Sequence, residues 1–114
     1  MLKALIAGGI AALTMTVTAC GSSSSVPSTV TINFNVTGST ITPANPKAVK
    51  GQNLTMVITT DKDEEVHFHG YDIQFDCKAN TPLSKTFTLD KSGSFDIELE
   101  ATSTHLTNFE VSPS

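Results

Sequence analysis

The feature that most constrains the fold is an alternation of apolar and polar side chains with a period of two residues. Across residues 29–36, Val30, Ile32, Phe34 and Val36 alternate with threonine and asparagine. In a β-strand, successive side chains point to opposite faces, so this period places the apolar residues on one face and the polar residues on the other. The segment is therefore predicted to be a strand with one buried face.

The same alternation returns along the chain between groups of turn residues. Shorter alternating segments occur at residues 54–58, 66–68, 73–77, 83–89, 95–99 and 109–111, and residue 41 lies in a short extended piece. No helical period appears after residue 28. Seven or eight short strands at this spacing predict an all-β fold, an antiparallel Greek-key β-sandwich. Residues 90–93, Asp-Lys-Ser-Gly, are expected to close a tight hairpin, with glycine supplying a positive φ angle.

The first residues have the composition of an export signal. Lys3 precedes an apolar or small-residue run over residues 4–17, which is too short and wrongly flanked to span a membrane. The segment then closes with Val-Thr-Ala-Cys, which resembles the lipobox of bacterial lipoproteins and implies lipid attachment to Cys20. We expect a lipoprotein signal peptide at residues 1–19, a lipidated cysteine with a serine-rich tether at 20–28, and the sandwich at 29–114.

The charged residues limit the classes of partner. The chain has eleven acidic residues against seven lysines, and it has no arginine. Binding to nucleic acid and electrostatic adhesion to anionic lipid both need clustered basic side chains. Neither is expected, so membrane contact would come from the acyl chains on Cys20. The expected location is the extracytoplasmic face of the bacterial cell membrane, and the expected state is a monomer.

Lipidation of Cys20 would leave Cys77 without a partner for an intramolecular disulfide. Such a thiol is buried, metal-bound or paired with another chain. Cys77 continues the alternation of Ile73 and Phe75, so the favoured interpretation is burial as a small hydrophobic residue. Met56 is likewise in phase with the core side of its predicted strand.

His67 and His69 give the sharpest chemical signal in the sequence. They are two residues apart in a predicted strand, whereas Val66 and Phe68 face the opposite side. This spacing places the two imidazoles roughly 6.5–7 Å apart along the strand. Both can then reach one metal ion, since bonds from histidine nitrogen to metals are about 2 Å long. Solvated or hydrogen-bonded histidines would give the same pattern.

Residues 65–73, Glu-Val-His-Phe-His-Gly-Tyr-Asp-Ile, and residues 87–100, which contain the turn at Gly93, carry a family resemblance. They resemble the cupredoxin superfamily, in particular cupredoxin-like secreted domains and the EfeO-type domain of bacterial iron-uptake proteins. The resemblance implies a cupredoxin-like sandwich over nearly all of the mature chain. It also implies that His69 stands at the place of the first copper-ligating histidine.

The ligand pattern departs from that of the family. A type 1 blue-copper site needs a thiolate, two imidazoles and a weak axial ligand. The family's cysteine would fall near Leu99, but no cysteine stands there and no methionine follows. We therefore expect the type 1 centre to be absent. His105 is expected in the loop where the second histidine belongs, with shifted spacing.

Two functions remain open. In the first, the domain binds or handles a metal ion: copper, or alternatively iron or zinc. The candidate ligands are His67, His69 and His105, with Asp72 or Glu65 as an oxygen ligand. In the second, a metal-free degenerate sandwich binds another protein of the envelope, such as a metal transporter or a redox protein. An enzyme is not expected, because the sequence has neither a supported catalytic triad nor a glycine-rich phosphate loop.

Overall fold

The computed structural model describes residues 26–114, so the predicted signal peptide and Cys20 lie outside the described residues. All nine elements in this part of the chain are strands. They are β1 (Thr29–Thr37), β2 (Thr40–Thr42), β3 (Lys47–Val49), β4 (Asn53–Thr60), β5 (Glu64–Phe68), β6 (Ile73–Cys77), β7 (Leu83–Thr88), β8 (Gly93–Leu99) and β9 (Thr104–Ser112). Within residues 26–114, no helix is long and apolar enough to cross a membrane.

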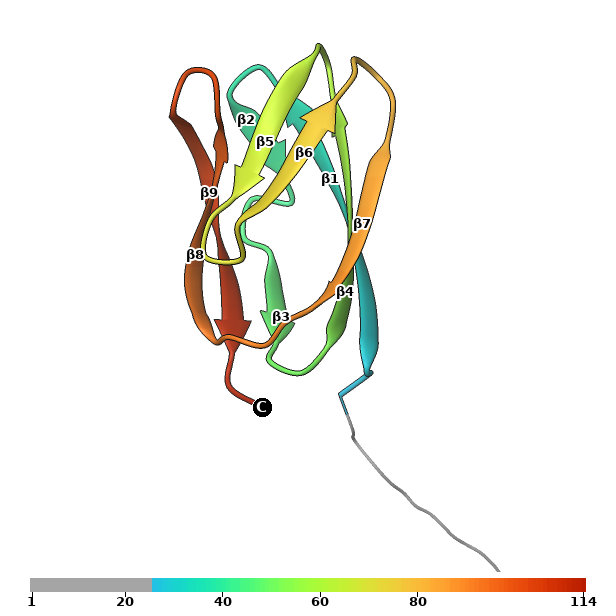
Figure 1. Ribbon diagram of the computed structural model, residues 1–114, viewed down its shortest axis with the longest axis vertical. Helices are drawn as coiled ribbons and strands as arrows, with labels where there is room; N and C mark the ends of the chain where they lie inside the picture. Colours follow the sequence, from blue (N-terminus) through green and yellow to red (C-terminus); the bar gives the residue numbers. More distant parts are fainter. Residues whose placement is uncertain (1–25) are drawn as a thin grey trace, which may run out of the picture.

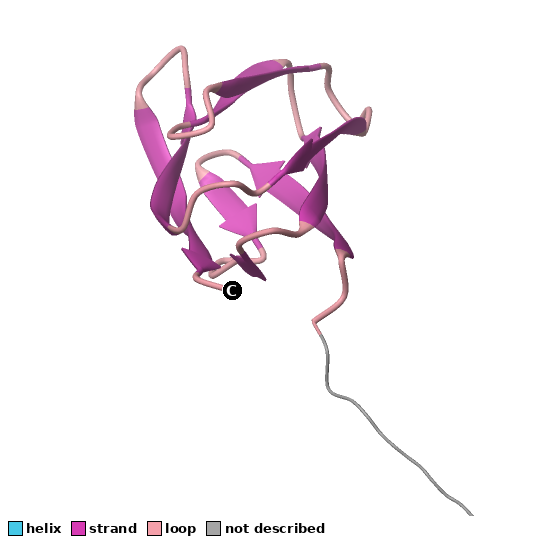
Figure 2. Ribbon diagram, turned by 60° about the horizontal axis from the view of Figure 1, so that its bottom comes forward, coloured by secondary structure: helices cyan, strands magenta, loops and turns pink. Residues whose placement is uncertain are grey.

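The strands form a sandwich of two sheets. One sheet has the order β2-β1-β4-β7, and the other has the order β3-β9-β8-β5-β6 (Figure 1). Seen from a tilted direction, the strands surround a common interior (Figure 2). Most neighbouring strands are antiparallel, but β1 pairs with β4 and β3 pairs with β9 in parallel. The all-β sandwich predicted from the alternation is confirmed, and both of its sheets are mixed.

The prediction of a hairpin at residues 90–93 is wrong. β7 pairs with β4 in the four-stranded sheet, whereas β8 pairs with β5 and β9 in the five-stranded sheet. The connection therefore crosses from one sheet to the other. Gly93 does have a positive φ, 140°. A glycine turn suits a crossover as well as a hairpin, so turn composition alone could not distinguish them.

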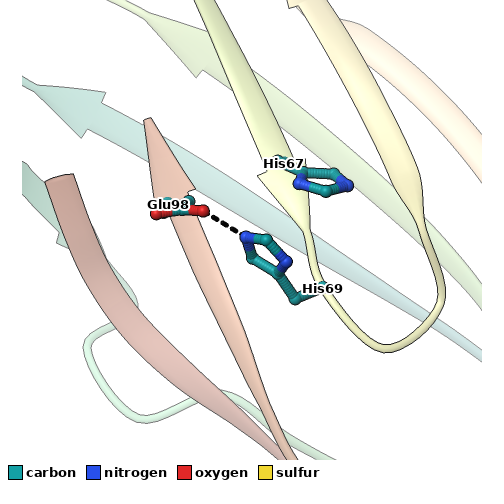
Figure 3. A group of neighbouring side chains, drawn as sticks. All are labelled: His67, His69 and Glu98. Carbon is teal, nitrogen blue, oxygen red and sulfur yellow. Dashed lines mark hydrogen bonds and ion pairs between the residues drawn. The ribbon is translucent and has the colours of Figure 1, made fainter. Parts of the chain in front are cut away.

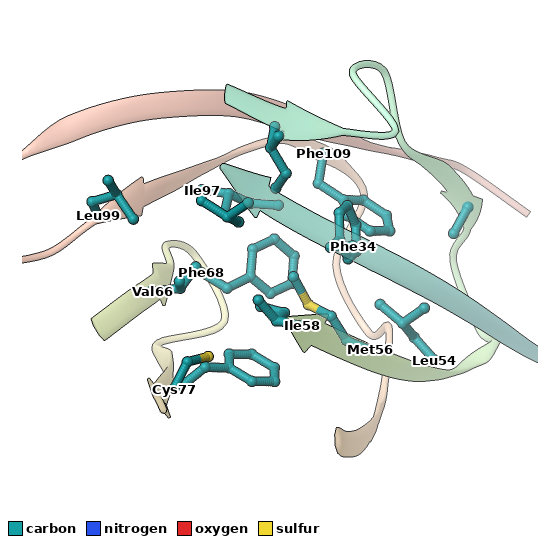
Figure 4. Packing of buried hydrophobic residues seen from close by; sticks show 14 of the residues in the cluster. Phe34, Leu54, Met56, Ile58, Val66, Phe68, Cys77, Ile97, Leu99 and Phe109 are labelled. Atoms are coloured by element: carbon teal, nitrogen blue, oxygen red, sulfur yellow. The ribbon is translucent and has the colours of Figure 1, made fainter. Parts of the chain in front are cut away.

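The inward positions of the two sheets form one hydrophobic core (Figure 4). Its fully buried aromatic residues are Phe34, Phe68, Phe75 and Phe109. The Phe68 ring is stacked on that of Tyr71, with centroids 5.2 Å apart, and its centroid lies 5.4 Å from that of Phe109. Met56 and Cys77 are buried, as predicted. Each large apolar side chain buried in this way contributes about 1.5–3 kcal/mol, which fixes the face that each strand turns inward.

Candidate metal site

The two histidines lie where β5 ends, on the outward side of the five-stranded sheet. Val66 and Phe68 are completely buried, so the alternation turns His67 outward. β5 ends at Phe68, and His69 begins the turn to β6. Because the backbone leaves the strand here, the two imidazole centroids are only 4.1 Å apart. This is closer than the roughly 6.5–7 Å expected along a regular strand.

The turn at residues 69–72 has a defined conformation. Gly70 has a φ of 86°, and a Cβ added there would overlap the Phe95 ring. The Tyr71 hydroxyl donates to the Lys91 carbonyl at 2.6 Å and accepts from the Lys91 N–H at 3.0 Å. These contacts attach the turn to the β7–β8 connection. They position His69 beside β8, where the backbone N–H of His69 donates to the backbone carbonyl of Asp96 at 2.8 Å.

Glu98 on β8 lies near both histidines and contacts His69 (Figure 3). The register of β5 and β8 places Glu98 directly opposite His67. Nε2 of His69 contacts Oε1 of Glu98. One ligand atom from each of these side chains lies within 4.8 Å of the other two, and all three residues are half-buried. We call His67, His69 and Glu98 the His–His–Glu group.

His67 lies between two further carboxylates. Its Nε2 is 3.1 Å from Oδ1 of Asp72, and its Nδ1 is 3.2 Å from Oε1 of Glu100. The Nδ1 atom is nevertheless buried without a hydrogen-bond partner. An unsatisfied buried polar atom costs about 1–3 kcal/mol. A ligand that bound this nitrogen would remove that cost and would therefore be stabilised there.

His105 lies outside the His–His–Glu group. It belongs to β9 rather than to a loop, so its expected loop position is wrong. Nδ1 of His105 contacts Oδ1 of Asp96, and Oδ2 of Asp96 is 4.0 Å from Nε2 of His69. Asp96 therefore connects His105 to the group. Glu65, the alternative oxygen ligand, instead accepts a hydrogen bond from Gln74.

The carboxylates change the acid–base behaviour of His69. The hydrogen bond with Glu98 is the largest cause and raises the pKa of His69 above its ordinary value of 6.5. Burial acts in the opposite direction, while the charges of Glu98, Asp96 and Glu100 raise the pKa further. A metal ion binds only the deprotonated imidazole, so a proton competes with the metal for His69.

The residues of this group fit a transition-metal ion. Two imidazole nitrogens and a carboxylate oxygen suit copper, zinc or iron. Atoms bonded to one such ion at about 2 Å lie at most about 4 Å apart, so a small side-chain rotation would bring the three ligands into range. Asp72 is exposed and lies beside His67, so its carboxylate can approach an ion held by the group.

The only described thiol lies on the other side of the sheet. Cys77 on β6 is buried in the core, and burial, followed by the charge of Asp76, raises its pKa to about 11 against the opposing effect of Lys85. Leu99, where the family's cysteine would fall, is also buried and is paired with Val66. Neither position faces the imidazoles.

Glu98 was missed by the sequence analysis, as were Asp96 and Glu100. The sequence did indicate that these three acidic residues face outward, because they alternate with Phe95, Ile97 and Leu99. The missing information was the pairing of β5 with β8, which places these carboxylates beside the histidines.

Comparison with solved structures shows which known fold the sandwich resembles. No protein-family model and no curated protein matches the sequence. The structure resembles a copper-binding protein determined in its apo form by NMR, with a TM-score of 0.63 and 16% identity, over 75% of this chain and 89% of that chain. It also resembles the metal-binding domain of the Cu(I)-exporting P-type ATPase CopA of Streptococcus pneumoniae D39, with a TM-score of 0.63 and 15% identity, over 74% and 86% of the two chains. The fold is cupredoxin-like.

A further structural neighbour comes from a larger assembly. It is a chain of a heme-copper terminal oxidase dimer, with a TM-score of 0.60 and 13% identity, over 71% of this chain and 63% of that chain. At these identities the likeness concerns architecture. Support for the His–His–Glu group comes from its own geometry on the outward face of the five-stranded sheet.

Proposed function

We propose that this cupredoxin-like domain binds a transition-metal ion through His67, His69 and Glu98. The observation that carries the proposal is the convergence of three ligand atoms within 4.8 Å of one another. The buried Nδ1 of His67 supports it, because this nitrogen makes no hydrogen bond, although the Glu100 carboxylate lies 3.2 Å away. Asp72 is proposed as an additional oxygen ligand. His105 is proposed to act through Asp96.

Copper is the proposed ion, with zinc and iron as alternatives. Imidazole and carboxylate ligands suit all three, and copper generally binds most tightly among the divalent ions. Two of the structural neighbours are described as a copper-binding protein and a Cu(I)-exporting ATPase domain. The sequence resemblance to EfeO-type domains supports iron as an alternative. No type 1 centre is included in the proposal, because Cys77 lies away from the imidazoles.

The proposed setting is the cell envelope. The lipobox-like sequence supports a lipid on Cys20 that holds the domain at the extracytoplasmic face of the bacterial membrane. The serine-rich tether would separate the sandwich from the lipid. In this position the domain would handle metal rather than catalyse a reaction, with an envelope transporter or redox protein as its partner. A protein-binding sandwich without metal is the alternative function.

The test is a titration of residues 22–114, which include every described strand, with Cu(II) and Zn. We expect one ion per chain, with a dissociation constant below about 1 μM, or about −8 kcal/mol. The double variant His67→Ala/His69→Ala should lose this binding. His105→Ala is the matched control, because it removes a histidine outside the group. It should weaken binding less than the double variant.

Equal, weak binding by the wild-type protein and the double variant would contradict the metal-binding proposal. That result would favour the protein-binding alternative. Capture of an envelope protein that is independent of metal and unaffected by chelators would be the corresponding positive finding.

A further inference from the structure

We infer that the His–His–Glu group selects oxidised copper, Cu(II), over Cu(I). The inference rests on the proposed metal site and specifies the oxidation state of its ion. Three properties of the described residues carry it: the chemical type of the ligand atoms, the location of the sulfur atoms and the charge around the imidazoles.

The ligand atoms are nitrogen and oxygen. Cu(I) is selected by soft thiolate and thioether ligands, whereas Cu(II) accepts imidazole and oxygen ligands in a square or tetragonal arrangement. His67, His69 and Glu98 supply two nitrogens and one oxygen. Asp72, with Oδ1 3.1 Å from Nε2 of His67, can supply a second oxygen. These four side chains match the ligand type and number of a Cu(II) site.

The described sulfur atoms are on the inward side of the sheets. Met56 and Cys77 have relative exposures of 0% and 1% and belong to the hydrophobic core (Figure 4). The raised pKa of Cys77 also keeps its thiol protonated at neutral pH. Among residues 26–114, neither a thiolate nor a thioether is therefore available to hold Cu(I) beside the imidazoles.

The charge around the imidazoles favours the ion of higher charge. Four carboxylates lie within 4.0 Å of the nitrogens of His67 and His69: Asp72, Asp96, Glu98 and Glu100. At a given position, each carboxylate attracts a divalent ion twice as strongly as a monovalent ion. Because Glu98 is only partly exposed, with 18% side-chain exposure, solvent screens its attraction less than it would at an open surface.

This concentration of negative charge is specific to one face. The outward side chains of β1 and β4, in the other sheet, are threonine and asparagine with a single valine, and none is acidic. The total charge of the chain therefore does not explain the acidic surroundings of the histidines. They follow from the placement of β5 beside β8.

The experiment compares the two oxidation states of copper with residues 22–114. Cu(II) is titrated in air against a competing chelator, and Cu(I) is titrated without oxygen against a chromophoric Cu(I) chelator. We expect Cu(II) to bind at least about 100-fold more tightly than Cu(I), because the ligands are nitrogen and oxygen. Electron paramagnetic resonance of the Cu(II) form should show nitrogen hyperfine coupling from imidazole, and its visible spectrum should lack the intense absorption of a copper–thiolate bond.

Glu98→Gln tests the part played by the carboxylate. It should weaken Cu(II) binding about 10- to 100-fold and change Cu(I) binding much less. Glu110→Gln is the matched control, because Glu110 is an outward carboxylate of the same sheet that accepts a hydrogen bond from the Ser94 hydroxyl. This control should change the affinity for Cu(II) by less than about twofold, since exposed distant charges are screened by salt.

The outcomes separate this inference from the proposed function. Cu(I) binding as tight as Cu(II) binding would overturn the selection of Cu(II) and leave the metal site in place. An equal loss of Cu(II) affinity in Glu98→Gln and Glu110→Gln would overturn the role assigned to the carboxylate. Failure of both copper ions to bind would contradict the proposed function itself.

Discussion

At the scale of single residues, the protonation of His69 depends on the carboxylates around it. The hydrogen bond with Glu98 stabilises the protonated imidazole and raises the pKa of His69 above 6.5. In the unfolded chain this partner is lost. Protonation of His69 is therefore coupled to folding.

This coupling predicts how the stability of the metal-free protein changes with pH. The contribution of the His69–Glu98 pair is fully present below about pH 6.5, the ordinary pKa of histidine in the unfolded chain. It is lost as the pH rises through the raised pKa of the folded protein. In urea unfolding without metal, we expect the wild-type protein to be more stable than His69→Gln at low pH, and the difference to shrink at higher pH.

The variant Glu98→Gln provides the control for this pH dependence. It keeps the size of the side chain but removes the charge, so its stability should change less between pH 6 and 8 than that of the wild-type protein. A difference between the wild-type protein and His69→Gln that stays constant over this range would contradict the assignment to His69.

At the scale of elements, the turn between β5 and β6 is essential for the position of His69. Gly70→Ala would place a Cβ at a φ of 86° and against the Phe95 ring. We expect a loss of about 1–3 kcal/mol in unfolding free energy from overpacking, in addition to the cost of the backbone conformation. Affinity for Cu(II) should fall as well, because relief of the clash moves the turn. Urea unfolding and copper titration measure the two effects.

Gly51→Ala is the matched control for this turn. Gly51 has a φ of 99°, but a Cβ there would have no atom within 4 Å. It therefore retains the backbone cost without the contact with Phe95. Equal losses of stability in the two variants, with copper affinity unchanged in both, would contradict the role of the Gly70–Phe95 contact.

The local alternation was sufficient to predict most strands and the side that each turns inward. It placed Phe34, Phe68 and Ile97 in the core and His67 on the outward side, because this property depends only on the period of two residues. Strand pairing was not predictable in the same way. The parallel pairing of β1 with β4, and the crossover between β7 and β8, depend on contacts between segments distant in the sequence.

The same difference between local alternation and strand pairing explains which residues of the candidate site could be predicted. His67 and His69 could be singled out because they are close in the sequence, and the structure brings their rings together. Glu98 could not, because its position beside His69 follows from the pairing of β5 with β8. His105 was expected in a loop, but β9 begins at Thr104 and directs it toward Asp96.

At the scale of the whole molecule, the His–His–Glu group exists only in the folded sandwich. His69 and Glu98 are 29 residues apart in the sequence and come together through the five-stranded sheet. An unfolded chain does not hold these ligands near one another. A metal ion bound by all three must therefore favour the folded state.

This linkage predicts a rise in thermal stability with metal. At a free Cu(II) concentration 100 times the dissociation constant, the folded state gains about 2.7 kcal/mol. For a domain of this size, each kcal/mol raises the Tm by roughly 4–8 °C, so the expected increase is on the order of 10–20 °C. Circular dichroism melting with and without Cu(II) measures it. His67→Ala/His69→Ala should show no comparable increase, and an equal increase in both proteins would place the bound copper outside the His–His–Glu group.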